Sequence, residues 1–544
     1  MLGLLTNICN GNGNMEDLGV LEDLAQLVKK ASLCGLGQSA PNPVVTTLKY
    51  FRHEYENHIK ARRCHAGACA QLFVAPCENA CPIHMNIPGY LTLLKEGRLA
   101  EAYAFLLQDN PLPATTGRVC HHPCQSRCRR CEVDGTVSTR EIHRFIADAM
   151  LENKKELRRV SPKRLKPTGK KIAIVGAGPA GLTAAYYLAK FGHHVTVYDA
   201  YPRAGGMLTY GIPEFRLPKK IVEQEVSIIQ KLGVRFIFNT KIGKDKSIAA
   251  LRRENDAVFL AIGAHRESPL RIQGEDADGV LSGVEFLRDF NFGKQVALGA
   301  QTVVIGGGNV AMDAARVAKR LGSEVTILYR REKSDMPADE EEITQAEEEG
   351  IPIMTLVAPQ RILVSNGRVK GITLVCMRPG DYDTAGRRVP TATEQTITLE
   401  CDTVIAAIGQ VCDSDFIGRS GIALHRSGTV QVDPFTLATN VPGVYAGGDV
   451  VTGPLTVSEA MGQGKQFARE LDKRLMGEDR FSSLFKKITY SNDVAVEPQG
   501  GPRNLMPTVA GDIRRHTFDE VTLRYDPAVA QREVTRCLRC DVKE

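Results

Sequence analysis

The sequence predicts an α/β protein in which two copies of a strand–glycine turn–helix–strand unit follow a helical part rich in cysteine. The first copy spans residues 171–199 and the second begins at Gln301, while most cysteines lie at residues 64–131. A chain of 544 residues is long enough for three or more domains. A hydrophobic fraction of 43% and 50 glycines also suit a packed α/β protein.

The first unit reads "KIAIVGAGPAGLTAAYYLAKFGHHVTVYD", in which an apolar run leads into Gly176, Gly178 and Gly181. The first glycine permits a tight turn, the second lets a pyrophosphate approach the backbone, and the third lets helix and strand pack closely. The phosphates then lie at the helix N-terminus, where unpaired N–H groups favour anions. Asp199, at the end of the second strand, is placed to bind ribose hydroxyls. The unit therefore predicts a Rossmann-like dinucleotide site.

The second unit reads "QTVVIGGGNVAMDAARVAKRLGSEVTILYRR". Gly306 and Gly308 fill the first two glycine positions, and Ala311 replaces the third. Where the first unit has Asp199, this unit has arginines, which bind a 2′-phosphate that a carboxylate would repel. It therefore predicts an NADP(H) site rather than an NAD(H) site; the alternative is a pair of surface arginines. The expected contacts of this site are Gly306, Gly308, Asn309, Arg330 and Arg331.

A third glycine-rich segment, residues 440–468, joins a strand to Asp449 and then to a helix that begins near Leu455, with Thr456 in its first turn. An aspartate there can bind a polyol hydroxyl, and the helix start can stabilise negative charge on a reduced flavin. Together with the "AIG" sequences at 261–263 and 407–409, the segment resembles the flavoproteins with two dinucleotide-binding domains. The resemblance implies that the NADP domain is inserted in the FAD domain, with Gly205 and Gly206 near the flavin ring.

Cysteine usage favours bound metal over disulfides. The N-terminus lacks the pattern of a signal peptide, and no apolar run is long enough to span a membrane. We therefore expect a cytoplasmic protein with reduced thiols, in which clustered cysteines bind metal. The net charge of +6 gives little support to a nucleic-acid partner, and we interpret the one basic run, residues 154–171, as a solvated linker.

The segments "APCENACPIHM" and "GRVCHHPCQSRCRRC" supply closely spaced thiolates, which suit iron–sulfur clusters and, as a rival, zinc. Their flanking sequences resemble the iron–sulfur domain of the glutamate synthase small subunit. The same domain occurs in dihydropyrimidine dehydrogenase and in the large subunit of NADH-dependent ferredoxin:NADP oxidoreductase. The resemblance implies two [4Fe–4S] clusters. The cysteines of these segments are Cys77, Cys81, Cys120, Cys124, Cys128 and Cys131.

In those relatives a CLxC pair precedes the CxxxCP segment, whereas here "TRCLRC" ends the chain. The stretch before it resembles the family's missing entry helix, so we expect the tail to fold back. The resemblance then implies one cluster with ligands Cys77, Cys128, Cys537 and Cys540. The other has ligands Cys81, Cys120, Cys124 and a fourth, where relatives use Glu or Gln. His143 occupies that position and Cys131 competes with it, so the fourth ligand stays open.

Two further cysteines, Cys64 and Cys69, stand in "HIKARRCHAGAC". Either they replace the tail pair as cluster ligands, or they form a separate zinc site with His58 and an unknown partner. We slightly favour zinc or another accessory metal.

Residues 15–60 resemble the end of the FMN-binding, NADH-oxidising subunit of complex I and of its relatives in bifurcating hydrogenases. There Cys34 would be the last ligand of a cluster, but the preceding CxxCxxC is missing from this sequence and Cys9 alone cannot replace it. We interpret Cys34 as a relic, although three ligands from elsewhere remain an alternative. We interpret the segment as a docking surface for a complex I-like partner; the alternative is a structural helical hairpin.

The expected domains are a helical docking segment (1–60), an iron–sulfur domain (61–165), the FAD domain in two parts (166–290 and 416–475), the NADP domain (291–415) and a C-terminal extension (476–544). A flavin is needed between a two-electron nicotinamide and one-electron clusters. The sequence thus predicts a NADPH-oxidising subunit of an electron-bifurcating transhydrogenase or hydrogenase, with ferredoxin-type carriers as partners. The alternatives are the glutamate synthase small subunit and a catalytically silent scaffold. No protein acid or base is expected to be catalytic.

Overall fold

A computed structural model of the chain describes residues 1–383, 387–493 and 500–542. Its first sheet is parallel and has the strand order β15-β4-β1-β2-β3. The edge strand β15 comes from far along the chain and pairs with β4, so this fold is completed only after the second one. This confirms that one nucleotide fold is inserted in the other. The strands are β1 (Lys171–Val175), β2 (His194–Tyr198), β3 (Arg235–Ile237), β4 (Ala257–Leu260) and β15 (Val444–Ala446).

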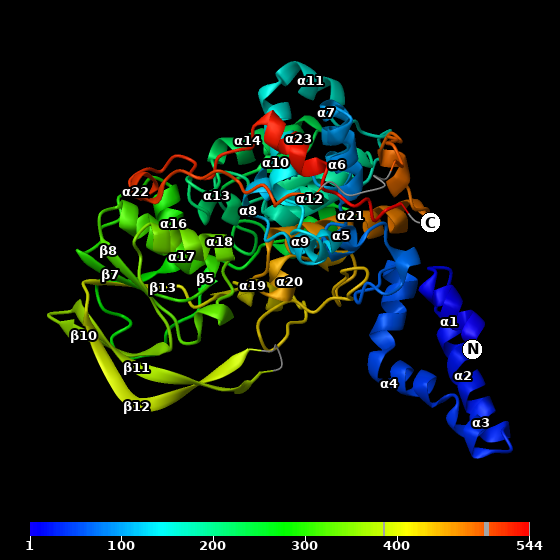
Figure 1. Ribbon diagram of the computed structural model, residues 1–544, viewed down its shortest axis with the longest axis horizontal. Helices are drawn as coiled ribbons and strands as arrows, with labels where there is room; N and C mark the ends of the chain where they lie inside the picture. Colours follow the sequence, from blue (N-terminus) through cyan, green and yellow to red (C-terminus); the bar gives the residue numbers. More distant parts are fainter. Residues whose placement is uncertain (384–386, 494–499, 543–544) are drawn as a thin grey trace.

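The second sheet is also parallel, in the order β6-β13-β7-β8-β9. Its first strand along the chain is β6, which precedes residue 291, the position at which we expected the NADP domain to begin. Its strands are β6 (Val280–Ser282), β7 (Gln301–Ile305), β8 (Glu324–Leu328), β9 (Ile353–Met354) and β13 (Thr403–Ala406). An antiparallel sheet of β10 (Val357–Ser365), β11 (Arg368–Tyr382) and β12 (Arg388–Glu400) extends from it as a long arm (Figure 1).

Helices cover the two sheets. In the first fold α12 follows the glycine turn and packs closely on α21. A capping box fixes the start of α21, because the Glu459 N–H donates to Thr456 Oγ1 and the Thr456 N–H donates to Glu459 Oε2. The main helices are α12 (Pro179–Lys190), α13 (Met207–Tyr210), α14 (Lys219–Lys231), α15 (Ile248–Glu254), α16 (Gly283–Asn291), α17 (Asn309–Arg320), α18 (Glu340–Glu348), α19 (Asp415–Gly418), α20 (Asp449–Thr452) and α21 (Val457–Met476).

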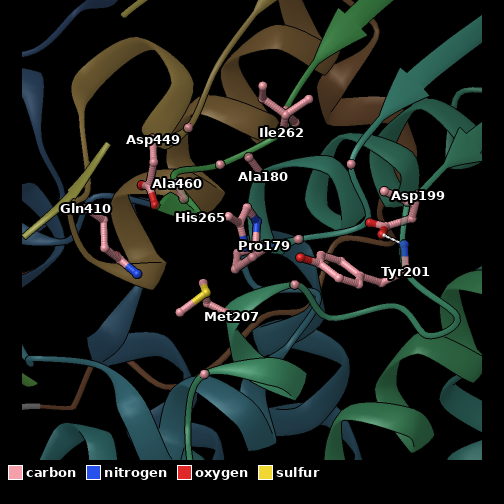
Figure 2. Close-up of a pocket in the computed structure, with 18 of the residues that line it drawn as sticks. Pro179, Ala180, Asp199, Tyr201, Met207, Ile262, His265, Gln410, Asp449 and Ala460 are labelled. Carbon is pink, nitrogen blue, oxygen red and sulfur yellow. Dashed lines mark hydrogen bonds between the residues drawn. The ribbon is translucent and has the colours of Figure 1, made fainter. Parts of the chain in front are cut away.

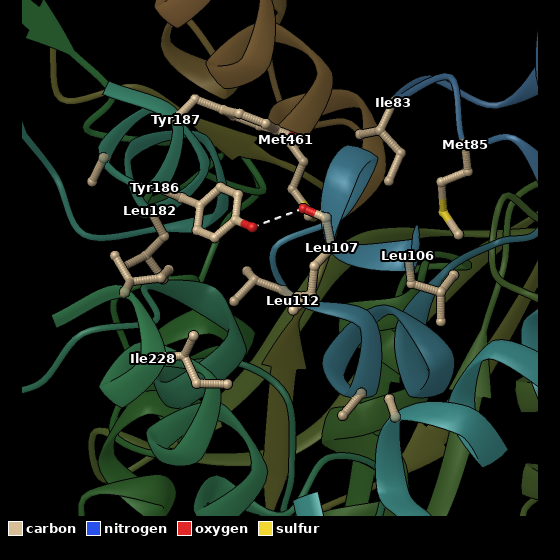
Figure 3. Close-up of a cluster of buried hydrophobic side chains, with 14 of the residues drawn as sticks. Ile83, Met85, Leu106, Leu107, Leu112, Leu182, Tyr186, Tyr187, Ile228 and Met461 are labelled. Atoms are coloured by element: carbon tan, nitrogen blue, oxygen red, sulfur yellow. Dashed lines mark hydrogen bonds between the residues drawn. The ribbon is translucent and has the colours of Figure 1, made fainter. Parts of the chain in front are cut away.

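The iron–sulfur domain is helical and shares its core with the first nucleotide fold. Figure 3 shows Leu107 and Leu112 packed towards Leu182 and Tyr186, and the Tyr186 hydroxyl donates to the Leu107 carbonyl at 2.7 Å. The two domains are therefore one packed body. The helices are α5 (Pro76–Ala80), α6 (Ile87–Lys95), α7 (Leu99–Asp109), α8 (Pro113–Val119), α9 (Pro123–Ser126), α10 (Thr139–Glu152) and α11 (Lys154–Val160).

Helix α11 corrects one expectation. The basic run from Lys154 begins as a helix rather than a linker, because the Asn153 side chain accepts from the Glu156 N–H and Leu157 packs on the core.

The C-terminal extension runs back across the molecule from α22 (Gly511–Arg514) to α23 (Pro527–Val534), which lies on α6 and α10 (Figure 1). Glu533 is fully buried and accepts from the Ser138 N–H at 2.8 Å, while Arg536 donates to the Thr136 carbonyl at 2.9 Å. Hydrogen bonds between buried charged and backbone groups therefore fix the end of the tail on the iron–sulfur domain.

The N-terminal segment forms α1 (Leu2–Cys9), α2 (Glu16–Ala31), α3 (Gly35–Ser39), α4 (Asn42–Glu56) and a π-helical turn η1 (Asn57–Ala61). It projects from the body (Figure 1) and has its own small core of Ile8, Leu18, Leu21 and Leu48. Among the described residues, no helix is both long enough and apolar enough to cross a membrane.

Candidate nucleotide and iron–sulfur sites

A cavity of about 580 Å³ opens at the carboxyl ends of the strands of the first sheet (Figure 2). Such a volume is in the range of small-molecule and cofactor sites. The predicted residues that line it are Gly176, Gly178, Asp199, Gly206, Asp449 and Thr456. Gly181 and Gly205 do not line it. They lie beside it in close backbone contacts, where a Cβ would meet Gly176 O at 2.0 Å or Thr209 Oγ1 at 2.0 Å.

The glycines of this cavity create space for a phosphate. A Cβ on Gly176 would lie 2.2 Å from the Ala261 carbonyl oxygen, and its φ of 107° is one that other residues rarely adopt. A Cβ on Gly206 would lie 2.9 Å from the Gly178 Cα, so the two turns approach each other at the entrance of the α12 N-terminus. Because glycine has no side chain, the space between the two turns stays free, and a pyrophosphate can approach the backbone there.

Asp199 lies at the end of β2. One carboxylate oxygen accepts from the Ala177 N–H at 2.7 Å, and the other accepts from the Tyr201 N–H at 2.8 Å, as Figure 2 shows for Tyr201. Burial raises the pKa of Asp199, although these two hydrogen bonds favour its charged form. The side chain thus fixes the glycine turn and also borders the cavity.

Asp449 enters the cavity from the other side, at the start of α20, and accepts from the Leu455 N–H at 3.4 Å. Burial raises its pKa to about 6. Thr456 caps α21, so the positive end of that helix faces the same cavity. The cavity can therefore accept a ligand that donates hydroxyls near Asp449 and carries negative charge near Thr456.

The sequence did not point to several lining residues, among them Tyr201, Met207, His265 and Gln410 (Figure 2). Two of them had a sequence signal, because His265 and Gln410 follow the two "AIG" sequences by one or two residues. Val310, Glu285 and Arg288 close the cavity from the second fold. The two nucleotide folds therefore meet at this cavity.

The second glycine turn repeats the first. A Cβ on Gly306 would lie 2.2 Å from the Ala407 carbonyl, and one on Gly307 would collide with the Tyr329 ring at 2.5 Å. A Cβ on Gly308 would approach only Pro337, at 4.0 Å, so that turn position is open. Asn309 begins α17 and is held from both sides. Its Oδ1 accepts from the Asp339 N–H at 3.1 Å, and its amide donates to His121 Nε2 at 2.7 Å.

The two arginines at the end of β8 differ. Arg330 is exposed, whereas Arg331 is buried and lies 3.3 Å from Asp383 in an ion pair. Both were expected to bind a 2′-phosphate. The structure instead gives Arg331 a carboxylate partner, so Arg330 is the arginine whose side chain is in contact with solvent at this position.

The tail brings its cysteines to the first cysteine group. Cys77, Cys128, Cys537 and Cys540 line one small cavity, together with Arg127 and Arg129. Burial, and then the nearby Cys537, raises the pKa of Cys77 well above its usual range. Thiols gathered in this way need a cation to be held as thiolates. The donor set, four sulfurs from three chain segments, fits an iron–sulfur cluster.

Cys81, Cys120 and Cys124 form a second group nearby. Burial raises the pKa of Cys124 well above its usual range, and the neighbouring thiolates of Cys81 and Cys120 add to the effect. Cys120 Sγ lies 4.0 Å from Ser458 Oγ in α21. A Cβ on Gly462 of the same helix would lie 2.5 Å from the Pro82 carbonyl. The helix whose first turn lines the cavity of the first fold therefore also touches this cysteine group.

The two candidates for the fourth ligand of the second cysteine group have different surroundings. His143 is buried in α10, burial lowers its pKa to about 4, and its Nε2 lies 3.5 Å from Thr116 Oγ1. Cys131 is exposed, and its N–H donates to the Cys128 carbonyl. The neutral imidazole of His143 has the chemistry of a ligand, but its hydrogen-bond partner is a threonine.

A third group joins His58, Cys64 and Cys69, whose ligand atoms lie within 4.8 Å of one another. His58 Nε2 is 3.3 Å from Cys69 Sγ. This group is separate from the two others in sequence and in ligand type. Cys34 is exposed at the start of α3.

Three features define the class of protein: a parallel fold with a flavin-sized cavity, a second nucleotide turn at that cavity, and clustered thiols beside it. They are the features of a flavin-dependent nicotinamide oxidoreductase with iron–sulfur centres. The chain belongs to the pyridine nucleotide-disulphide oxidoreductase family, which matches residues 170–464. Residues 45–155 match the 4Fe-4S domain II of dihydropyrimidine dehydrogenase, and residues 1–58 match the iron–sulfur binding region of the NADH-ubiquinone oxidoreductase F subunit. It is an NADPH-dependent FAD oxidoreductase of the glutamate synthase small subunit-like group.

Three relatives support this assignment. The NADP(+)-dependent formate dehydrogenase subunit beta of Moorella thermoacetica and the NADPH-Fe(3+) oxidoreductase subunit beta of Geobacter sulfurreducens are each 37% identical, over 99% of this chain and 86% of the relative. The glutamate synthase [NADPH] small chain of Escherichia coli is 34% identical, over 76% of this chain and 90% of the relative.

Proposed function

We propose that this chain is the NADPH-oxidising subunit of a multisubunit electron-bifurcating transhydrogenase or hydrogenase, in which electrons pass reversibly between NADP(H), FAD and two [4Fe–4S] clusters. The observation that carries the proposal is the position of α21. Its first turn borders the flavin cavity through Thr456, Ser458 lies 4.0 Å from Cys120 Sγ of the second cysteine group, and Gly462 lies against Pro82, the residue after Cys81. The same helix would therefore contact both a flavin held in the cavity and a cluster held by the second cysteine group.

Bound FAD would supply the exchange between a two-electron hydride and single electrons. The chain positions the reactants. The glycine turn and the α12 N-terminus would hold the pyrophosphate, Asp199 and Asp449 would accept sugar hydroxyls, and the α21 N-terminus would stabilise negative charge on the ring. Val310 and Arg288 bring the second fold to the same cavity, which supports direct approach of the nicotinamide.

For the clusters we propose the ligand set Cys77, Cys128, Cys537 and Cys540, which includes the tail pair, and a second set built on Cys81, Cys120 and Cys124. The fourth ligand of the second set is His143 or Cys131. We further propose that His58, Cys64 and Cys69 bind an accessory zinc ion, because thiolate and imidazole are the ligands that zinc prefers.

The proposed partners are a complex I-like subunit that binds FMN and NADH, and ferredoxin-type carriers. The match of residues 1–58 to a complex I-type region supports the first, and relatives named as beta subunits support a multisubunit setting. A second candidate is the small subunit of glutamate synthase, which the 34% identity to that chain favours. The remaining alternative is not an enzyme but a scaffold subunit, which retains the folds and lacks turnover.

Anaerobic purification from the native host tests the proposal. We expect FMN- and NADH-binding subunits to co-purify and NADPH to reduce a dye. The chain separated from these subunits should hold one FAD and about eight iron atoms, four for each cluster. Cys540→Ser should lower iron to about four atoms per chain, whereas Cys401→Ser, a change in the core of the second fold, should not. A glutaminase-bearing partner would identify glutamate synthase. Full FAD without dye reduction would identify a scaffold, and iron-free protein would refute the cluster assignment.

A further inference from the structure

The iron–sulfur domain contacts the second nucleotide fold at its glycine turn. The contact is made by His121 and His122, which lie between Cys120 and Cys124 of the second cysteine group. His121 Nε2 lies 2.7 Å from the side-chain nitrogen of Asn309, the first residue of α17. A residue next to an expected cluster ligand therefore touches a residue that is expected to bind NADP(H).

The direction of this hydrogen bond follows from the other contact of Asn309. Its Oδ1 accepts from the Asp339 N–H at 3.1 Å, so the amide nitrogen is the atom that lies against His121. An amide nitrogen can only donate, so His121 Nε2 is the acceptor and Nδ1 carries the proton of the neutral ring. These two contacts leave one hydrogen of the Asn309 amide for another acceptor.

The histidine loop is wrapped around the Cys120 sulfur. His122 has a φ of 41°, in the left-handed region that residues with a side chain rarely adopt, and its N–H donates to Cys120 Sγ at 3.4 Å. Such a conformation persists only where the surroundings fix it, and it is frequent at functional positions. The same turn leaves His122 Nε2 4.0 Å from Asp339 Oδ2. Both histidine rings therefore reach the second fold.

A buried arginine adds a further link between the two domains. Arg140 of α10 is 8% exposed, and its guanidinium donates to the Cys120 carbonyl at 3.3 Å and to Glu341 at 2.6 Å. Glu341 lies in the first turn of α18, the helix that Asp339 caps. Charge-assisted hydrogen bonds are among the stronger polar contacts in proteins. The loop of the second cysteine group and the second glycine turn are therefore held together at more than one point.

We propose that His121 is a positioning residue for NADP(H), which holds the Asn309 amide for the phosphates at the α17 N-terminus and links their binding to the second cysteine group. The proposal rests on the proposed function, which assigns NADP(H) to the second turn. A phosphate at that turn would accept the amide hydrogen that His121 leaves free. Without His121, the Asn309 side chain would keep one contact fewer and would lose more rotational freedom when the ligand binds. Because His121 directly follows Cys120, a ligand that tightens the Asn309 contact would also alter the surroundings of that sulfur.

The first test measures how tightly the anaerobically purified holoenzyme binds 2′-phosphoadenosine 5′-diphosphoribose. This fragment of NADP(H) has the phosphates but no nicotinamide, so it exchanges no electrons with the protein. His121→Leu and His121→Asn should each weaken its binding roughly 3–10-fold, the range expected for loss of one hydrogen bond. His121→Gln should bind it within about twofold of wild type, because its amide oxygen replaces Nε2 as the acceptor, whereas the Asn side chain is one carbon shorter. His53→Leu, which changes an exposed histidine of α4, is the matched control and should have no effect.

The second test records the electron paramagnetic resonance spectrum of the reduced clusters with and without the same fragment. We expect the fragment to change the signal of the second cluster in wild type and in His121→Gln. In His121→Leu and His121→Asn, saturating fragment should leave this signal unchanged. A histidine that only stabilised the fold would not connect the ligand to the cluster signal in this way.

Three results would overturn the proposal: unchanged affinity in His121→Leu and His121→Asn, a loss in His121→Gln as large as in His121→Leu, or a signal change that persists in His121→Leu. If His121→Leu does not fold, the comparison of His121→Gln with His121→Asn decides. Failure of the proposed function would be distinct. It would show as wild-type protein that does not bind the fragment, or as Gly306→Ala that binds it normally.

Discussion

The two nucleotide folds of this chain have the same glycine turn, but the side chains around the turn differ. In both, a Cβ on the first glycine, Gly176 or Gly306, would lie 2.2 Å from the backbone carbonyl oxygen of the residue that directly follows a neighbouring strand. In the first fold the turn borders a cavity of about 580 Å³. In the second, Tyr329 lies against the turn and Asn309 is held by His121 and Asp339.

From this difference we infer that the repeated backbone turn would bind the phosphates, whereas side chains at the strand ends would select the nucleotide. Asp199 ends β2 with its carboxylate fixed by two N–H groups. At the same place in the second fold the chain has Arg330 in solvent and Arg331 in an ion pair. The carboxylate suits ribose hydroxyls and the exposed arginine suits a phosphate.

The largest effect should come from breaking one turn at a time. Gly176→Ala should abolish FAD incorporation and destabilise the first fold by roughly 2–6 kcal/mol, because backbone strain and overpacking each cost about 1–3 kcal/mol. Gly306→Ala has the same clash but should leave FAD content unchanged and abolish NADPH binding. Flavin content and NADPH titration measure both. Normal FAD in Gly176→Ala would show that this turn does not hold the pyrophosphate.

Next in size is the nucleotide preference of the second fold. Arg330→Ala should raise the KM for NADPH roughly 10–100-fold, since a hydrogen bond to a charged group contributes about 1.5–3 kcal/mol, and should leave NADH almost unaffected. Arg331→Ala, which removes one of the ion pairs of Asp383, should lower the thermal midpoint more than the affinity. Equal losses of NADPH and NADH in Arg330→Ala would contradict the assignment of the 2′-phosphate to this arginine.

A smaller effect concerns the charge in the first cavity. The folded pKa of Asp449 is about 6, above its usual 3.8. A raised pKa gives stability that is present below the unfolded value and is lost as pH rises through the folded value. In FAD-free protein, Asp449→Asn should therefore stabilise more at pH 8 than at pH 5, by about 1 kcal/mol, as measured by unfolding.

Asp256→Asn provides the opposite control in the same fold. The N–H of Lys171 lowers the pKa of Asp256 from its usual 3.8, so the substitution should destabilise more as pH rises towards about 5 and then equally between pH 5 and pH 8. The same pH trend for both variants would refute the burial argument for Asp449.

The smallest effect should come from the third position of the turns, where the folds differ by a methyl group. Gly181 tolerates no Cβ, since it would meet Gly176 O at 2.0 Å, whereas Ala311 occupies the corresponding place. Ala311→Gly should cost only about 1 kcal/mol through helix propensity and leave NADPH affinity unchanged, while Gly181→Ala should weaken FAD retention. Thermal midpoints and flavin release measure both, and a loss of NADPH affinity in Ala311→Gly would contradict this view.

Much of the fold was accessible to sequence reasoning. The two turns, the insertion of one fold in the other and the helical iron–sulfur part agree with the structure and the family matches. The cavity was accessible only in part. Asp199 and Asp449 carry a local signal, but Tyr201 and Met207 line the cavity because of chain paths that no short motif encodes. The run from Lys154 was misread because its high charge concealed one packed leucine.

Residues close together along the chain set the local chemistry: glycines where a phosphate must approach, an acid or arginines at a strand end, and cysteines at fixed spacings. These follow from neighbours along the chain, which set turn and helix geometry. Tertiary structure decided which distant groups meet. It placed the last cysteines beside Cys77, and Asp383 against Arg331 rather than Arg330. Such meetings depend on how helices and the returning tail pack, and packing is a property of the whole core.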